Sequence, residues 1–111
     1  MREGAVILLP LRQADGKVKP RPAVALRQLP GFGDWLVCGV GRQLHQFVGG
    51  FDEQVSGTDP DFALSGLTGP SLIRLSFLQS VPLSAIMGRI GAISADCQRR
   101  LLSNLSRHLT P

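Results

Sequence analysis

Residues 5–11 read AVILLPL, and residues 21–27 read RPAVALR. Both stretches are rich in aliphatic side chains and bounded by polar residues, a pattern typical of buried strands. Pro22 lies near the start of the second stretch, where a missing backbone N–H is tolerated. The sequence therefore predicts two consecutive strands near the N-terminus.

The segment that joins these strands, residues 12–20, contains Asp15 and Gly16, a typical turn pair. Nine residues is long for a tight hairpin, so we expect a mobile loop. Net charge is +4 over residues 12–27, −4 over residues 51–61 and +4 over residues 74–107. The first basic segment can attract a phosphate backbone or an acidic protein, and a solvated loop would have the same composition.

The remaining strands are shorter, apart from one apolar stretch. Residues 35–40, WLVCGV, are apolar throughout, which indicates a strand in the middle of a sheet. Short strands are expected at 51–55, 71–75 and 87–92. Residues 62–65 follow Pro60 and are expected to form a helical turn.

Residues 94–109 form the clearest helical pattern. Ser94 is the expected N-cap, with Asp96 in the first turn. Apolar side chains recur every four residues from Cys97 to Leu109, so the helix is amphipathic and should lie on a sheet. Several strands followed by one C-terminal helix indicate an α+β domain or a small barrel.

Size and composition exclude several classes of protein. The chain has 111 residues, and its 43% hydrophobic content argues for one folded domain over residues 1–111. The longest apolar run is residues 5–11, whereas a membrane-spanning helix needs about 20 residues. The N-terminus lacks the pattern of a secretory signal, so we expect a cytoplasmic protein.

The sequence predicts neither a metal nor a cofactor. Cys38 and Cys97 are expected to be buried thiols, because disulfides are rare in a reducing compartment. The soft ligands Cys38, His45, Cys97 and His108 are not spaced like a zinc motif. No phosphate-binding loop and no hydrolase nucleophile motif occurs in the sequence.

Four stretches follow one another in the order of a known family. They are GAVILLP at 4–10, KPRPAVAL at 19–26, VCGVGRQ at 37–43, and PSLIRL at 70–75 with IMGRIGAIS at 86–94. On these stretches the chain resembles the MazF/PemK growth-inhibitor toxins of bacterial toxin–antitoxin systems. The resemblance implies a small SH3-like antiparallel β-barrel with a C-terminal amphipathic helix, usually a homodimer. It also implies a metal-independent endoribonuclease that cleaves single-stranded RNA and is blocked by a cognate antitoxin.

The resemblance also assigns residues. Arg21 matches the family's motif arginine and would stabilise the charge of the transition state or donate a proton. Lys17 and Lys19 lie in the segment that covers the active site in the family, and they would steer and contact phosphate. Gln43 matches the family's conserved glutamine and would bind substrate.

The chain departs from the family just before Gln43. The family commonly carries Ser or Thr there, and this chain carries Gly41 and Arg42. Arg42 would bind phosphate and form a two-arginine cradle with Arg21. His45 titrates near neutral pH, so it is a candidate general base, and a plain surface histidine is the alternative.

Aromatic residues offer a further candidate for RNA contact. Trp35 and the five phenylalanines have rings that can stack on unpaired bases. Because aromatic residues make up only 5% of the chain, we expect most of them inside the core.

Three functions stay open. The leading one is a toxin that cleaves single-stranded RNA. The second, motivated by Gly41 and Arg42, is a catalytically impaired relative that binds an antitoxin, RNA or another protein. The third is an inhibitor of DNA gyrase, as in the CcdB toxins that share this fold.

Overall fold

The computed structural model describes residues 1–12 and 14–110. Residue 13, in the segment expected as a loop, and residue 111 lie outside the described residues. The strands are β1 (Ala5–Arg12), β2 (Val18–Gln28), β3 (Trp35–Gly41), β4 (Glu53–Val55), β5 (Ser71–Val81) and β6 (Gly88–Ala92). The helical segments are η1 (Leu44–Gln46), α1 (Phe62–Ser65), η2 (Leu83–Ala85) and α2 (Ala95–Leu109).

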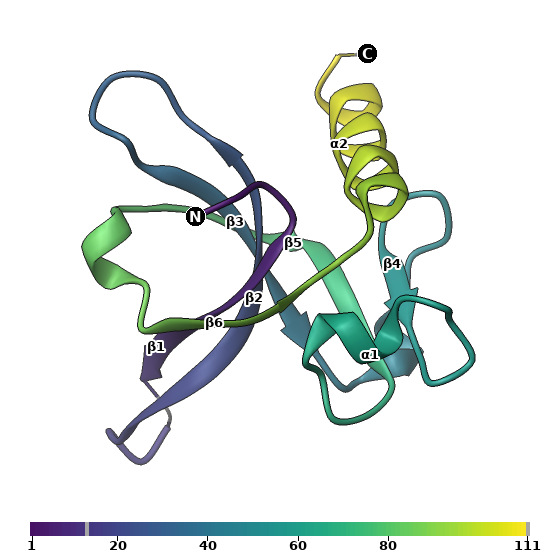
Figure 1. The fold of residues 1–111 in the computed structure, drawn as a ribbon, viewed down its shortest axis with the longest axis horizontal. Helices are drawn as coiled ribbons and strands as arrows, with labels where there is room; N and C mark the ends of the chain where they lie inside the picture. The colour runs from purple at the N-terminus through teal and green to yellow at the C-terminus, as the bar shows by residue number, and fades with distance from the viewer. Residues whose placement is uncertain (13, 111) are drawn as a thin grey trace.

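Within the described residues, the six strands form one antiparallel sheet in the order β4-β5-β3-β2-β1-β6. The sheet curls into a half-barrel, with β4 and β6 at its edges (Figure 1). The apolar strand β3 lies inside the sheet, between β5 and β2, as its sequence predicted. The expected α+β class, with a curled antiparallel sheet and a C-terminal helix, is confirmed. No helix of the described part is long and apolar enough to span a membrane.

Helix α2 covers one face of the sheet. Ser94 caps it, since its Oγ accepts the Cys97 N–H at 3.1 Å. Leu101 is fully buried among Val24, Leu26 and Ile73 of the same core cluster. Leu109 was expected on this apolar face, but it is 66% exposed, because the last turn of the helix extends past the residues that it covers.

A second core cluster lies on the other face of the same strands. Val6 and Val24 belong to the cluster under α2, whereas their neighbours Ile7 and Ala25 belong to the second one. Successive side chains of a strand point to opposite faces, so β1 and β2 are buried on both sides. This explains why residues 5–9 are apolar without alternation.

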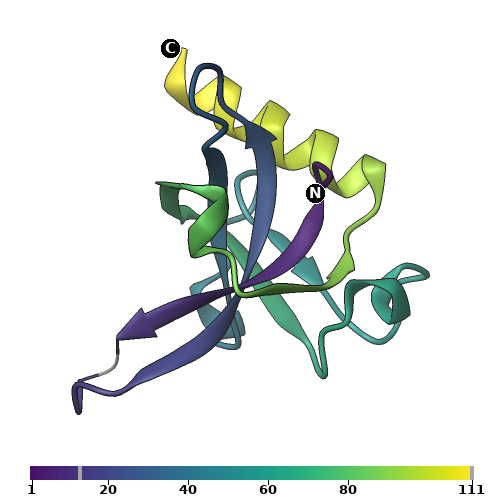
Figure 2. The same cartoon turned by 60° about the vertical axis from the view of Figure 1, so that its left-hand side comes forward.

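The segment after β1 is more ordered than the sequence predicted. Residues 18–20 were expected in a loop, but they pair with residues 10–12 in the antiparallel register Pro10↔Pro20, Leu11↔Lys19 and Arg12↔Val18. Residues 9–12 and 18–21 therefore form a two-stranded ribbon, here called the arm, which projects from the body in Figure 2. Leu11 and Val18 favour strands, and they carry the pairing beyond the point where the polar composition indicated a loop.

Strand β5 contains an irregularity that shapes the face opposite α2. Gly39 pairs with Arg74, whereas the preceding Cys38 pairs with Leu78. Three residues of β5, Leu75–Phe77, are therefore extra relative to β3, and we call them the β5 bulge.

A buried carboxylate holds this bulge. Asp52 is 1% exposed, and its Oδ1 accepts the Leu75 N–H at 3.1 Å. Its Oδ2 accepts the Val48 N–H, also at 3.1 Å. The carboxylate thus supplies an acceptor to the backbone N–H of a bulge residue, and it ties the segment before β4 to β5.

Replacing Asp52 with Ala should lower the free energy of unfolding by about 3 kcal/mol, because the buried N–H of Leu75 loses a charged acceptor. Urea titration followed by circular dichroism measures this loss. Asp59→Ala is the matched control, since the exposed Asp59 carboxylate also accepts a backbone N–H, that of Ser56 at 2.6 Å. It should cost about 0.5 kcal/mol because water replaces the carboxylate. Equal losses in the two variants would contradict the role given to Asp52.

Candidate functional site

The face of the sheet opposite α2 carries a groove of about 660 Å³. Its floor is apolar and includes Leu9, Ala23 and Val37, which belong to the second core cluster. The base of the arm and the β5 bulge form its sides. The lining residues come from four strands: Leu9, Pro10, Leu11, Arg21, Pro22, Ala23, Val37, Gly39, Val40, Gly41, Ser76, Phe77, Leu78 and Gln79.

Arg21 is the charged residue of this lining. It lies in β2 opposite Leu9, at the base of the arm, so the sheet fixes its backbone. Its side chain is exposed, and no ion pair within residues 1–12 and 14–110 involves it. The guanidinium therefore projects at an apolar groove with its donors available to a ligand, which suits a phosphate.

Gly41 and Arg42 take different positions. Gly41 ends β3 and lines the groove. The Arg42 guanidinium donates to Thr68 Oγ1 in the segment after α1, and Arg42 is not part of the lining. The structure thus brings Arg21 and Gly41 together in one groove, and it does not bring the Arg42 guanidinium to them. The phosphate-binding role of Arg42 stays a prediction.

The other residues singled out from the sequence are exposed and lie outside the lining. Lys19 lies on the arm, and Lys17 is in its turn, where its N–H donates to Asp15 Oδ1 at 2.9 Å. Gln43 and His45 lie at the start and in the middle of η1. The two lysines extend the positive charge of Arg21 along the arm, away from the body.

Three phenylalanines contradict the expectation that most aromatic rings are in the core. Phe32 is 99% exposed, Phe77 is 55% exposed and Phe47 is 43% exposed. Phe51 and Phe62 pack against the core under α2, and Trp35 is buried, so its ring is unavailable to a base. Of the exposed rings, that of Phe77 lies in the groove.

No sequence pattern pointed to two neighbours of Phe77. Ser76 is the residue with a hydroxyl in the lining. Arg74 places its Cζ 4.2 Å from the centroid of the Phe77 ring and donates from Nη1 to Gln46 Oε1 at 2.8 Å. The pattern of residues 71–75 predicted a regular strand. In a regular strand the neighbouring side chains of residues 76 and 77 would not both face the groove. The bulge depends on distant Asp52, which no local pattern reveals.

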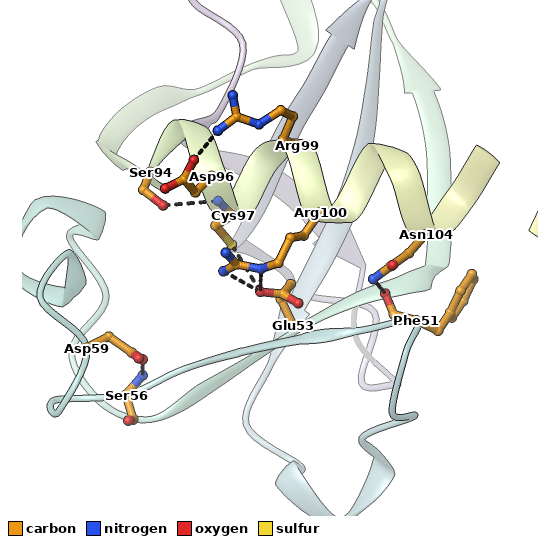
Figure 3. A network of polar contacts seen from close by, with 10 residues as sticks. All are labelled: Phe51, Glu53, Ser56, Asp59, Ser94, Asp96, Cys97, Arg99, Arg100 and Asn104. Atoms are coloured by element: carbon orange, nitrogen blue, oxygen red, sulfur yellow. Dashed lines mark hydrogen bonds and ion pairs between the residues drawn. The ribbon is translucent and has the colours of Figure 1, made fainter. Parts of the chain in front are cut away.

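A second cavity, of about 250 Å³, lies at the start of α2. Its charged lining consists of Glu53, Asp59, Asp61, Asp96 and Arg100, with Cys97 beside them. Figure 3 shows that Glu53 is held by Arg100, whose Nη2 is 2.8 Å from Glu53 Oε1. This acidic cavity would repel a polyanion. No group of three metal-ligating His, Cys, Asp or Glu side chains gathers within the described residues.

The two cysteines are free and buried, as expected. Burial raises the pKa of Cys38 to about 12. Burial, followed by the charge of Glu53, raises the pKa of Cys97 to about 12. Because the thiolate is the nucleophilic form, neither cysteine is activated for catalysis.

The fold is that of known toxins. The MazF-mt6 toxin of Mycobacterium tuberculosis matches this structure with a TM-score of 0.67 at 18% sequence identity, over 95% of each chain. A solved structure of an Mtb toxin matches with a TM-score of 0.60 at 19% identity, over 88% of this chain and 97% of that one. No family sequence model and no curated protein sequence matches the chain. The predicted MazF-like fold is therefore confirmed, and the chemistry of the groove rests on this chain's own residues.

The raised thiol pKa values predict a loss of stability in alkali. Both folded-state pKa values, about 12, lie above the ordinary thiol pKa of 9.0. The stabilising contribution of the two neutral buried thiols is complete below pH 9. It is lost as the pH rises toward 12, because the thiols of the unfolded chain ionise before those of the folded protein. Urea titrations at pH 7, 9 and 10 should show this fall. Cys38→Ala and Cys97→Ala should each reduce its slope, and a free energy of unfolding independent of pH over this range would contradict the assignment.

Proposed function

We propose that this protein is the toxin of a toxin–antitoxin pair and cleaves single-stranded RNA without a metal. The observation that carries the proposal is the position of Arg21, which faces an apolar groove from a rigid strand and has no ion-pair partner among the described residues. The MazF-like fold supports the toxin class, since both solved relatives are toxins.

The proposed reaction uses the RNA's own nucleophile. The 2′-hydroxyl oxygen attacks the adjacent phosphorus and loses its proton, and the bond from phosphorus to the 5′-oxygen of the next nucleotide breaks as that oxygen gains a proton. Negative charge grows on the phosphate oxygens between these two events. Arg21 stabilises this charge through guanidinium N–H donors, and it cannot act as the base because it stays protonated.

The groove of this chain offers a different hydroxyl from that of the family. Gly41 has no side chain, whereas Ser76 in the β5 bulge lines the same groove. In the proposal Ser76 donates to a phosphate oxygen from the side opposite the arm. The lining contains no histidine, aspartate or glutamate that could act as the base. The 2′-proton therefore leaves to solvent or to His45 outside the lining, and we expect slow cleavage.

The proposed partners follow the family pattern. An antitoxin would block the groove, and two copies of the chain would form a homodimer in the cytoplasm. Lys17 and Lys19 would draw the RNA backbone along the arm, with an affinity that falls as salt rises.

A second function is favoured by one observation. Gly41 supplies no hydroxyl, and the Arg42 guanidinium binds Thr68 instead of turning to the groove. A protein with the same groove and no cleavage activity would bind RNA or an antitoxin as a module. The two variants below separate this function from the nuclease.

Arg21→Ala should reduce the rate of RNA cleavage by about 100-fold, the loss typical for removal of one charge-stabilising donor. The measurement is fragment release from an end-labelled single-stranded RNA of mixed sequence in the presence of a chelator. Arg27→Ala is the matched control, because Arg27 is also exposed in β2 but faces Glu3 at 3.7 Å outside the groove. Unchanged cleavage by Arg21→Ala would overturn the proposed site, and cleavage that depends on a metal would overturn the mechanism.

Gly41→Thr should increase cleavage by restoring a hydroxyl to the groove. The position accepts a side chain, because no heavy atom lies within 4 Å of a Cβ built there and its φ is not positive. Gly41→Ala adds the Cβ alone and should leave the rate unchanged. Cleavage that appears only in Gly41→Thr would identify the natural protein as the impaired module, and equal rates in Gly41→Thr and Gly41→Ala would show that the hydroxyl is not limiting.

A further inference from the structure

The ring of Phe77 occupies an unusual position for a large apolar side chain. It belongs to the β5 bulge, lines the groove together with Arg21, and is 55% exposed. A half-exposed aromatic ring in the wall of a groove that also carries a free guanidinium matches the two contacts that unpaired nucleic acid makes with proteins, base stacking and phosphate binding.

The backbone beneath the ring is shaped to receive it. A Cβ on Gly39 would lie 3.1 Å from Phe77 Cβ and 3.3 Å from its Cδ2. Both distances are shorter than ordinary van der Waals contact, so a larger residue at position 39 would push the ring away. Gly39 in β3, which has no side chain, therefore leaves the space that the Phe77 side chain occupies.

A cation lies over one face of the ring. The Arg74 Cζ lies 4.2 Å from the ring centroid, within the range of a cation–π contact. Arg74 is itself held by Gln46 Oε1 at 2.8 Å, and its buried Nε has no hydrogen-bond partner within the described residues. The guanidinium is thus kept against the ring although one of its donors stays unsatisfied. A ring held in this way loses little freedom when a base stacks on it.

We propose that Phe77 is a stacking platform for one unpaired base of the RNA, next to the phosphate bound by Arg21. This inference rests on the proposed function, because it assigns the base-binding part of the same groove. Because every base has a π-face, stacking on Phe77 does not depend on the base sequence of the RNA. Phe77 therefore contributes affinity and fixes where the RNA strand lies in the groove, and Arg74 and Gly39 act as positioning residues for its ring.

The test uses single-stranded RNA with 2′-O-methyl sugars, which cannot attack its own phosphates. One 2-aminopurine is moved through successive positions, and binding is followed by fluorescence anisotropy and by quenching of that base in the presence of a chelator. We expect strong quenching at one position with the natural protein. Phe77→Ala should weaken binding by about 10-fold and abolish this quenching, as is typical for loss of one stacked base.

Three further variants make the result specific. Phe77→Trp should restore both signals because it restores a π-face, whereas Phe77→Leu should restore neither fully. Phe32→Ala removes a ring that is 99% exposed but outside the groove, and it should change nothing. The thermal unfolding midpoint of each variant shows that a loss of binding does not reflect a loss of fold.

Unchanged affinity and quenching in Phe77→Ala would overturn the platform, as would equal restoration by Leu and Trp, which would indicate simple apolar burial. The outcome is separate from the nuclease proposal, because cleavage of unmodified RNA is measured with Arg21→Ala in the experiment above. Stacking by a natural protein that cuts no RNA would support the platform and overturn the nuclease. Failure of the natural protein to bind the modified RNA while it binds an apolar peptide in the groove would overturn the platform in favour of a protein ligand.

Discussion

The buried carboxylate of Asp52 determines the shape of the face that carries the groove. Its two oxygens accept the backbone N–H groups of Leu75 and Val48, so it joins the β5 bulge to the segment before β4. Burying a carboxylate without such partners is costly, and here each of its two oxygens accepts a backbone N–H. Because the bulge is held, Ser76 and Phe77 stay in the groove wall. The chemistry proposed for the groove therefore depends on an acid that never contacts the substrate.

The groove with Arg21 and the acidic cavity lie at different parts of the molecule. The groove and Arg21 lie on the face away from α2, whereas the cavity lined by Glu53 and Asp96 lies at the start of α2. A polyanion that approaches the molecule is attracted by Arg21 and the lysines of the arm and repelled by this acidic cavity, which favours binding at the groove. The net charge of +4 alone conveys none of this, because the acidic and basic segments alternate along the chain.

The sequence predicted the elements whose pattern is local. The Ser94 cap, the apolar row of α2 as far as Leu105 and the uninterrupted apolar strand β3 each depend on neighbours within a few residues, and all three are confirmed. The arm and the β5 bulge were missed because they depend on partners distant in sequence: residues 18–20 become a strand only against residues 10–12. The same dependence on distant partners explains which residues of the candidate site were missed. Arg21 was found from a motif, whereas Ser76 and Phe77 enter the groove through the bulge, and Arg74 contacts the Phe77 ring from outside the lining.

The arm exposes a two-stranded edge on both sides, which invites association with other β-strands. Leu11 and Val18 are both about half exposed there, so each strand of the ribbon also presents an apolar side chain to solvent. The Leu8 carbonyl accepts the N–H of Met87, which directly precedes β6, so the alternation of a strand turns the backbone nitrogen of Pro10 outward. The pairing turns that of Pro20 outward on the other edge. Proline offers no N–H at either place. An incoming strand would meet a gap in the ladder on each edge, and the ribbon is thereby protected against the stacking that leads to aggregates.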